Sequence, residues 1–236
     1  MHGAILLAAG SGNRMGDTVD DKILARIGKS NAFTMSCLAF AKVNKITTLV
    51  VVYRDEPQKD LLKKEIEQKI EPHIHKNIIW IKGGNQRGDS VQNGLKALPE
   101  ACEFAHIHDC ARPLIQAETI QFMVNRVEKM IPIAVARPAT NTIRKKISHD
   151  QSDAGCSKTE TLDRNSLWEM ETPQSAPKTW LSQGYEKAKE LNLVITDDMH
   201  AIELLSKDMD LHDPGYPNPK ITHPLDLRFI TFLSDL

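Results

Sequence analysis

Apolar and polar positions follow two regular patterns through residues 1–136. Short apolar runs, many of them β-branched, are each followed by a longer segment whose apolar residues recur at helical spacing. The runs are typical of strands buried on both faces, and the longer segments are typical of helices that cover a sheet. Ile46–Tyr53 is the clearest of the expected strands. This alternation predicts an α/β fold with a parallel sheet and right-handed crossovers.

The pattern also gives approximate bounds for each element. Strands are expected in the first half of 4–15 and at 46–53, 77–81, 105–108 and 133–136. Helices are expected at 33–42, 60–70, 90–98, 118–130, 178–190, 197–205 and 224–236. Pro214, Pro217 and Pro219 mark a turn-rich approach to the last of these helices.

Residues 137–161 break this pattern, because they are polar, irregular and poor in large apolar side chains. Two short stretches, 142–145 and 159–162, could pair as the strands of a hairpin. A long structureless loop is unusual inside a compact domain. We therefore expect the segment to protrude towards a partner, such as the same segment of a second subunit.

The first turn, around Gly10 and Gly12, has the composition of a phosphate-binding loop. Glycine lets backbone N–H groups approach an anion closely, and two cations, Arg14 and Lys22, come after it. Two related motifs fit less well. The dinucleotide fingerprint needs its third glycine one place before Gly16 and an acid near residue 30, and neither is present. A phosphate loop ending at 28–30 would lack its first glycine and the preceding strand.

Ligands of open parallel sheets bind at the carboxyl ends of the strands. This rule collects into one crevice the Gly10 loop, the segments 83–90 and 109–112, and the polar insertion. Segment 83–90 offers flexible backbone, an amide and the guanidinium of Arg87, and we expect Ser90 at a helix N-terminus. Asp109 and Arg112 place a carboxylate and a cation just beyond a strand.

Composition and charge argue against some classes of binding partner. The formal net charge is −1, which argues against a general nucleic-acid or membrane surface. No apolar run is long enough to cross a bilayer, and we expect no targeting segment before the first strand. The four cysteines, at 37, 102, 110 and 156, have no C-x-x-C spacing. We therefore expect reduced thiols in a cytoplasmic protein.

Several motifs in chain order together resemble the 2-C-methyl-D-erythritol 4-phosphate cytidylyltransferase family. They are Ala-Ala-Gly-Ser-Gly-Asn-Arg-Met (8–15), Gly-Gly-x-x-Arg-x-Asp-Ser-Val-x-x-Gly-Leu (83–95), His-Asp-x-Ala-Arg-Pro (108–113), Asp-Arg-Asn-x-Leu-Trp (163–168), Thr-Pro-Gln (172–174), Thr-Asp-Asp (196–198) and Lys-Ile-Thr-x-Pro-x-Asp-Leu (220–227). The first of these is shared with sugar-nucleotide pyrophosphorylases, and the later ones narrow the resemblance.

The resemblance implies a fold and an activity. It implies a single Rossmann-like nucleotidyltransferase domain over 1–236, with a mainly parallel sheet and a protruding β-arm at 137–161. The enzyme would join CTP to methylerythritol phosphate with Mg²⁺, releasing pyrophosphate in non-mevalonate isoprenoid synthesis. It would be a homodimer in which each arm clasps the partner.

The resemblance also assigns roles by position. Arg14 and Lys22 match the catalytic cations, and no side chain is assigned as a metal ligand. The positions expected to contact CTP are Ala8, Ala9, Gly10, Gly12, Gly84, Asn85, Arg87, Ser90, Cys110 and Arg112. Those expected to hold the acceptor are Asp109, Thr142, Arg164, Thr172 and Lys220, with Thr142 and Arg164 reaching across the dimer.

Some positions depart from the family pattern. The family usually has Pro-Lys-Gln around its second catalytic cation, whereas this chain has Asp21-Lys22-Ile23. Asn85 stands in place of a common Asp, and Cys110 in place of Ala. Ribitol 5-phosphate remains an alternative acceptor, and a non-catalytic nucleotide-binding protein remains an alternative class. A dehydrogenase is disfavoured by the glycine spacing.

Overall fold

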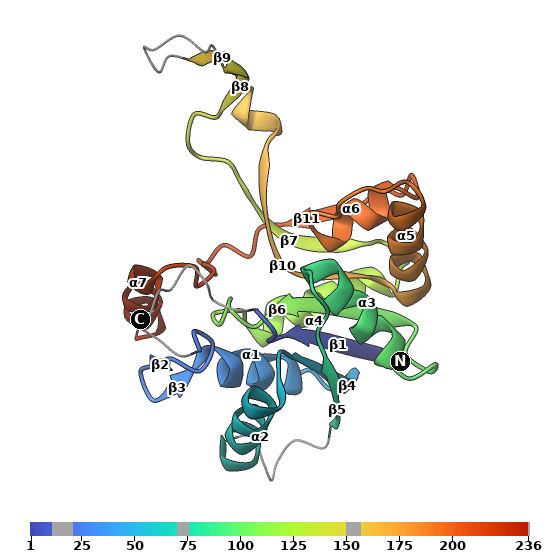
Figure 1. Cartoon of the computed structure of the whole chain (residues 1–236), viewed down its shortest axis with the longest axis vertical. Coiled ribbons are helices and arrows are strands. Elements are labelled where there is room, and N and C mark those ends of the chain that lie inside the picture. The colour runs from blue at the N-terminus through green and yellow to red at the C-terminus, as the bar shows by residue number, and fades with distance from the viewer. Residues whose placement is uncertain (11–20, 70–75, 150–156, 236) are drawn as a thin grey trace.

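The computed structural model describes residues 1–10, 21–69, 76–149 and 157–235. Within them a seven-stranded sheet runs through the molecule in the order β11-β7-β10-β6-β1-β4-β5 (Figure 1). Its strands are β1 (His2–Leu7), β4 (Ile46–Tyr53), β5 (Asn77–Lys82), β6 (Phe104–Asp109), β7 (Ile133–Pro138), β10 (Trp168–Pro177) and β11 (Asp210–His212). Two short pairs lie outside it, namely β2 (Arg26–Ile27) with β3 (Ser30–Asn31), and β8 (Arg144–His149) with β9 (Ser157–Thr161).

The helices follow the predicted order. They are α1 (Ala32–Ala41), α2 (Glu56–Lys69), α3 (Arg87–Ala97), α4 (Ala117–Val127), α5 (Lys178–Glu190), α6 (Asp198–Glu203) and α7 (Pro224–Ser234), with a short 3₁₀ turn, η2, at Arg164–Ser166. None of these described helices is long and apolar enough to span a membrane.

The sheet is covered on both faces, and its strands alternate between two hydrophobic cores. In β4, Leu49 and Val51 pack in one core, whereas Val50 and Val52 pack in the other. The first core includes side chains of α1, α2, α4 and α7, and the second includes side chains of α3, α5 and α6. Figure 1 shows α1 and α2 on the side of the sheet opposite α5 and α6.

The α/β fold with a mainly parallel sheet is confirmed. β1 pairs in parallel with β4 and β6, β4 with β5, and β7 with β11. One central strand differs from the expectation, because β10 runs antiparallel to both β6 and β7. The sequence predicts no strand there, since two prolines and few β-branched residues interrupt the segment and the register with β7 is irregular between Met170 and Gln174.

The polar insertion forms an antiparallel pair, in which Arg144 lies opposite Thr161 and Lys145 opposite Glu160. This agrees with the hairpin that the sequence predicts. Figure 1 shows β8 and β9 standing away from the seven-stranded sheet, joined to it by long connections from β7 and to β10.

Candidate active site

A cavity of about 580 Å³ opens at the carboxyl ends of β1, β4, β5 and β6. These four strands are parallel neighbours, so the segments beyond their ends meet at the same edge of the sheet. Its lining residues are Leu7, Ala8, Ala9, Gly10, Lys22, Ile23, Arg54, Gly84, Asn85, Gln86, Arg87, Ser90, Asp109, Ala111, Lys220 and Thr222. The cavity therefore unites many of the positions that the sequence predicts for nucleotide binding.

The segment after β5 packs too closely for side chains at its two glycines. A Cβ at Gly83 would lie 2.8 Å from the Ala9 Cβ, and one at Gly84 would lie 2.2 Å from the Asp89 Cβ. The backbone N–H of Gly84 donates to the Ser90 Oγ over 3.1 Å. Helix α3 begins at Arg87, so Ser90 lies in its first turn and not at its start, where the sequence predicts it. The Ser90 hydroxyl fixes the glycine turn.

Lys22 lies over the first loop. A Cβ at Gly10 would be 4.0 Å from the Lys22 Cε, so the absence of a side chain there leaves the loop backbone open beside the lysine. The Lys22 ammonium donates to the Ile221 carbonyl oxygen over 3.1 Å. This bond ties the lysine to the segment that carries Lys220. Arg14 and Gly12, the other predicted positions of this loop, lie outside the described residues.

Asp109 is the centre of a charged network at the end of β6. Arg87 donates from Nε to one Asp109 carboxylate oxygen over 3.1 Å, and Lys220 donates to the other over 2.5 Å. The two terminal nitrogens of Arg87 bind the fully buried Asp198 carboxylate at 3.2 and 2.8 Å. Tyr185 adds a hydrogen bond to Asp198 over 2.6 Å. Bidentate pairing of this kind fixes the position and orientation of a guanidinium and also balances its charge.

The network keeps Asp109 ionised. Burial alone would raise the pKa of this carboxyl, but the positive charges of Arg87 and Lys220 outweigh it and hold the pKa well below its usual range. Both oxygens already accept hydrogen bonds from cations, so the carboxylate is poorly suited to take a proton. Asp109 is better suited to orient neighbouring cations and hydroxyl groups.

Thr172 lies beneath Asp109. Its hydroxyl oxygen accepts a hydrogen bond from the Asp109 backbone N–H over 3.1 Å and also contacts the His108 Nδ1 at 3.1 Å. The side chain is buried and does not line the cavity. His106 lies two residues earlier on β6 and bonds Ser175 and His2. Both β6 histidines are therefore held by structural partners.

Two further predicted positions do not line the cavity. The Arg112 guanidinium donates to the Asn218 carbonyl oxygen over 3.0 Å and lies 3.7 Å from Glu171. Cys110 is fully buried in the first core, and burial raises the pKa of its thiol. Its backbone N–H bonds the Leu7 carbonyl, which joins β6 to β1. The predicted contacts of Arg112 and Cys110 with CTP stay predictions.

Thr142 and Arg164 lie together in a separate hollow of about 440 Å³. The other residues that line it are Thr161, Leu162, Asp163 and Asn165, at the base of the β8–β9 pair. The Arg164 side chain donates to the Thr140 carbonyl over 2.9 Å. This hollow shares no lining residue with the main cavity, so the positions predicted for the acceptor divide between two places in one chain.

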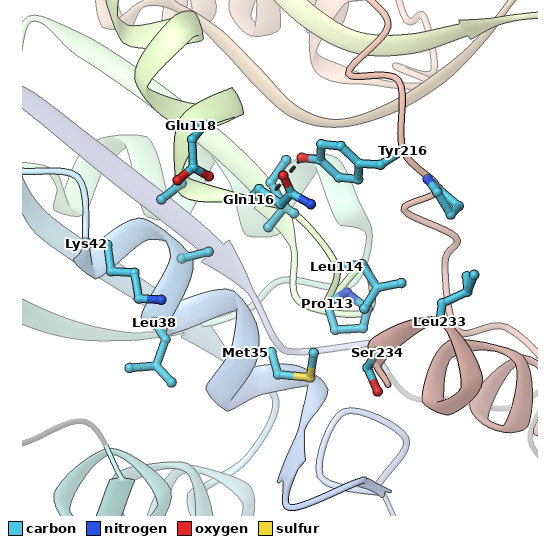
Figure 2. A pocket seen from close by; sticks show the side chains of 14 residues that line it. Met35, Leu38, Lys42, Pro113, Leu114, Gln116, Glu118, Tyr216, Leu233 and Ser234 are labelled. Carbon is cyan, nitrogen blue, oxygen red and sulfur yellow. Dashed lines mark hydrogen bonds between the residues drawn. The ribbon is translucent and has the colours of Figure 1, made fainter. Parts of the chain in front are cut away.

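A third hollow, of about 480 Å³, lies between α1, the 113–118 segment and α7 (Figure 2). Figure 2 shows Met35 and Leu38 on its α1 side and Tyr216 pointing towards Gln116. The Tyr216 hydroxyl accepts a hydrogen bond from the Gln116 backbone N–H over 2.9 Å. Of the described residues around it, Lys42 alone is cationic. This hollow presents fewer cations to a polyphosphate than the main cavity does.

Arg54 lines the main cavity and is not among the positions predicted from the sequence. It directly follows β4, and its guanidinium binds Asp55 over 2.9 Å and Asp21 over 3.3 Å. The sequence carries a signal for it, because a cation directly after the clearest strand belongs to the same carboxyl edge as the first loop.

Asp197 and Asp198 have different roles. Asp197 caps α6, and Asp198 anchors Arg87.

The described side chains offer few ligands for a metal ion. In the described parts of the chain no three histidine, cysteine or acidic side chains form a cluster suited to a metal ion. Asp109 is the acidic side chain that lines the main cavity, and both of its oxygens are paired with cations. Such a site fits a Mg²⁺ ion that arrives with a triphosphate and keeps phosphate and water as ligands.

Comparison with protein families identifies the chain. The profile of the 2-C-methyl-D-erythritol 4-phosphate cytidylyltransferase family matches residues 3–234. The chain belongs to this family. The resemblance drawn from the motifs is therefore confirmed over nearly the whole length.

Individual relatives agree with this assignment. A 2-C-methyl-D-erythritol 4-phosphate cytidylyltransferase of Clostridioides difficile is 32% identical over 228 residues, covering 97% of this chain and 91% of that protein. A chloroplastic one of Oryza sativa is 31% identical over 223 residues, covering 94% and 71%. The crystal structure of 4-diphosphocytidyl-2C-methyl-D-erythritol synthase from Anaerococcus prevotii matches with a TM-score of 0.81 and 25% identity, covering 100% and 99%.

Proposed function

We propose that this protein transfers a cytidylyl group from CTP to 2-C-methyl-D-erythritol 4-phosphate and releases pyrophosphate. The observation that carries the proposal is the cavity at the carboxyl edge of the sheet, in a chain of this family. It brings the Ala8–Gly10 backbone, Lys22, the Gly84 turn and Lys220 around one space. Loop backbone and cations around one space suit a triphosphate that meets a second phosphate.

The chemistry needs no general base. The attacking group is a phosphate monoester oxygen, which is largely dianionic at neutral pH because its second pKa is near 6. The difficulty is the approach of two anions and the charge that builds on the α-phosphate. In this proposal Lys22 stabilises that charge, together with Arg14, and Lys220 holds the acceptor phosphate beside Asp109.

The ion network supplies positioning for these steps. Asp109 keeps Lys220 in the cavity, and Arg87 in turn fixes Asp109 against the buried Asp198. Cations that are already oriented before substrate arrives need no rearrangement when charge develops, which is the source of electrostatic catalysis. An acceptor phosphate would compete with Asp109 for the Lys220 ammonium.

Mg²⁺ belongs to the proposal as a companion of CTP. It would neutralise phosphate charge, and Asp109, the acidic side chain that lines the main cavity, would orient one of its water ligands. A cytoplasmic location also stays part of the proposal. The three described cysteines, Cys37, Cys102 and Cys110, are free and buried, which is consistent with a reducing compartment.

The acceptor half is proposed to need a second subunit. Thr142 and Arg164 lie at the base of the β8–β9 pair, in a hollow separate from Lys220 and Asp109. A homodimer in which each 137–161 arm reaches the other subunit would bring the two sets together. The exposed side chains in the described part of the arm, and its position away from the seven-stranded sheet, support this arrangement.

The test is pyrophosphate release from CTP and Mg²⁺ with two acceptors in parallel, methylerythritol 4-phosphate and ribitol 5-phosphate. We expect rapid release with the first and little with the second. Release with ribitol 5-phosphate alone would overturn the acceptor and retain the CTP site. Silence with both acceptors, in protein shown by calorimetry to bind CTP, would favour a nucleotide-binding protein without this activity.

A further inference from the structure

The residue before Lys22 is an aspartate that is almost completely enclosed. The Asp21 side chain is 8% exposed. One carboxylate oxygen accepts from the Ile23 backbone N–H over 3.1 Å, and the other accepts from the Gln58 amide over 2.6 Å and from Arg54 over 3.3 Å. Its own carbonyl oxygen accepts from the next turn of backbone, at Leu24 and Ala25. The chain on both sides of Lys22 is therefore held through Asp21.

Gln58 connects this aspartate to the first loop. Its buried amide nitrogen donates both to Asp21 and to the Ala8 carbonyl oxygen, the latter over 3.0 Å. Its amide oxygen accepts from the Arg54 backbone N–H over 2.7 Å. One side chain thus sets the separation between the end of β1, the end of β4 and the segment that carries Lys22.

Arg54 contributes charge to the same cluster. A carboxylate beside the space for a triphosphate would repel it, and would weaken the field of the adjacent Lys22 ammonium. The Arg54 guanidinium bonds both Asp21 and Asp55, and lines the main cavity. It therefore offsets the negative charge that the fixation of Asp21 introduces.

The flanks of Lys22 also depart from the family pattern at this point, since Asp21 stands where the resemblance predicts proline. A proline restricts the backbone through its ring. Here three side chains provide the restriction through hydrogen bonds. This gives the cluster a role that the family motif alone does not describe.

We propose that Asp21, Gln58 and Arg54 are positioning residues for Lys22. The cluster holds the lysine backbone at a fixed distance from the Ala8–Gly10 loop, so that the ammonium lies beside the α-phosphate when CTP binds. The proposal rests on the proposed function, because it assigns Lys22 to that reaction. None of the three residues needs to touch a reacting atom.

The central test is a double-mutant cycle between Asp21→Asn and Lys22→Ala, measured as kcat for pyrophosphate release at saturating CTP. We expect Asp21→Asn alone to lower kcat by about tenfold to a hundredfold, on the scale of a misplaced catalytic group, with the KM for CTP changed less. In the Lys22→Ala background it should have no further effect, since residues that act as a unit are not additive. Independent, multiplying losses would overturn the proposal.

A polarity exchange provides a rescue. Gln58→Glu should lower kcat, because it removes the donor to Asp21 and to Ala8 and adds a second carboxylate. Combining it with Asp21→Asn lets the new amide donate to the new carboxylate and keeps one negative charge beside Arg54. We expect the pair to recover part of the kcat lost by either change, since the Ala8 carbonyl still lacks its donor. A double variant as slow as the product of the single losses would contradict the mechanism.

The matched control is Glu65→Gln, on helix α2, which also carries Gln58. Glu65 is a partly buried carboxylate that accepts hydrogen bonds from Asn31, Thr34 and Lys69, and it does not contact Asp21. We expect its kcat to equal that of the unaltered protein. A loss as large as that of Asp21→Asn would show a general effect of stability and would count against positioning.

Hydrogen exchange separates this proposal from the proposed function. The backbone amides of Ile23, Leu24 and Ala25 bond to Asp21, so Asp21→Asn and Gln58→Glu should speed their exchange in protein without substrate. Unchanged exchange would overturn the cluster even in an active enzyme. Inactivity of the unaltered protein with both acceptors would contradict the function instead, and exchange alone would then decide whether the cluster fixes this segment.

Discussion

The cavity at the carboxyl edge of the sheet and the hollow at the base of the β8–β9 pair differ in how their side chains are held. In the cavity, Asp109 bonds two cations and Arg87 bonds two carboxylates, from strands and helices on separate parts of the chain. In the hollow, Arg164 bonds a nearby carbonyl, and most of the lining is local in sequence. Among the described residues, the charged side chains of the cavity are paired with one another, and this cavity is the completed region; in the hollow, Arg164 bonds a backbone carbonyl instead.

Loss of Lys22 is expected to have the largest effect, because it removes a cation from the completed region. Lys22→Ala should lower kcat/KM by about 10²–10³, the scale of losing one donor to a developing anion. The measurement is pyrophosphate release at varied CTP. The control is Lys42→Ala, which removes the cation of the hollow in Figure 2 and should leave the rate unchanged. Equal losses in both variants would contradict the assignment of the active cavity.

Much of this completed region could be predicted from the sequence. The Ile46–Tyr53 strand and the apolar run before Gly10 each carry a strong local signal, and the rule for parallel sheets brings together the segments at their carboxyl ends. This reasoning finds Lys22, Gly84 and Ser90. The sequence predicts the start of α3 at Ser90, later than its observed start at Arg87, because Gln86 is a weak capping residue and a Gln–Asp capping box replaces the usual one with serine or threonine.

The remainder depends on contacts that no local pattern shows. Strand β10 inserts between β6 and β7 although its prolines weaken any strand signal. Asp198 has the sequence context of a helix cap, yet it is fully buried and binds Arg87 more than a hundred positions away. Long-range ion pairs depend on where elements pack, and that information is spread over the whole sequence.

The next prediction weakens the ion network directly. Asp198→Asn should reduce the free energy of unfolding by about 2 kcal/mol, because it removes the buried negative charge that pairs with the partly exposed Arg87 guanidinium, which keeps Asp109 as its second partner. Denaturant unfolding measures this. Its neighbour provides the control: Asp197→Asn keeps the cap of α6, loses one hydrogen bond from the Gln174 amide, and should change stability by less than Asp198→Asn does. Similar losses from both changes would show that the helix cap, not the ion pair, dominates.

The third prediction concerns the exposed hollow. Arg164→Ala should raise the KM for the acceptor by about tenfold or more, the value of a hydrogen bond to a charged group, with CTP affinity unchanged. Arg228→Ala, which alters an arginine on α7 outside both regions, should have no effect. Steady-state kinetics with each substrate varied in turn distinguishes the two arginines.

Mixing variants tests whether Arg164 acts across a dimer. Chains carrying Lys22→Ala and chains carrying Arg164→Ala should regain activity when unfolded and refolded together, since one site of each mixed dimer then holds both intact residues. At an acceptor concentration well below its KM, where sites that lack Arg164 are slow, random pairing predicts roughly a quarter of the activity of the unaltered protein. If mixing restores nothing, Arg164 serves the site of its own chain, and the two regions would have to meet within one subunit.

The smallest effect concerns pH and the strand that supports the completed region. Burial lowers the pKa of His106 from 6.5 to about 3, so the folded protein keeps this ring neutral where the unfolded chain takes up a proton. Below pH 6.5 the unfolded state therefore binds more protons, and stability falls as the pH falls, by roughly 1 kcal/mol per unit, until the folded ring protonates. His108 titrates in the same way, with a pKa of about 3.

His106→Gln should reduce this acid dependence without removing it, because His108 and His2 remain. His106 contacts Ser175 at 2.7 Å and His2 at 3.1 Å, and His2 in turn faces Glu128 and, through it, Lys45. The comparison is best made between pH 6.5 and about 5, above the pKa values of ordinary carboxyl groups. Denaturant unfolding at each pH gives the slope. An unchanged slope would mean that neighbouring groups compensate for the protonation of His106. This part of β6 would then accept a positive charge without a fixed ion pair, whereas Asp109 at the end of the strand is held in ion pairs.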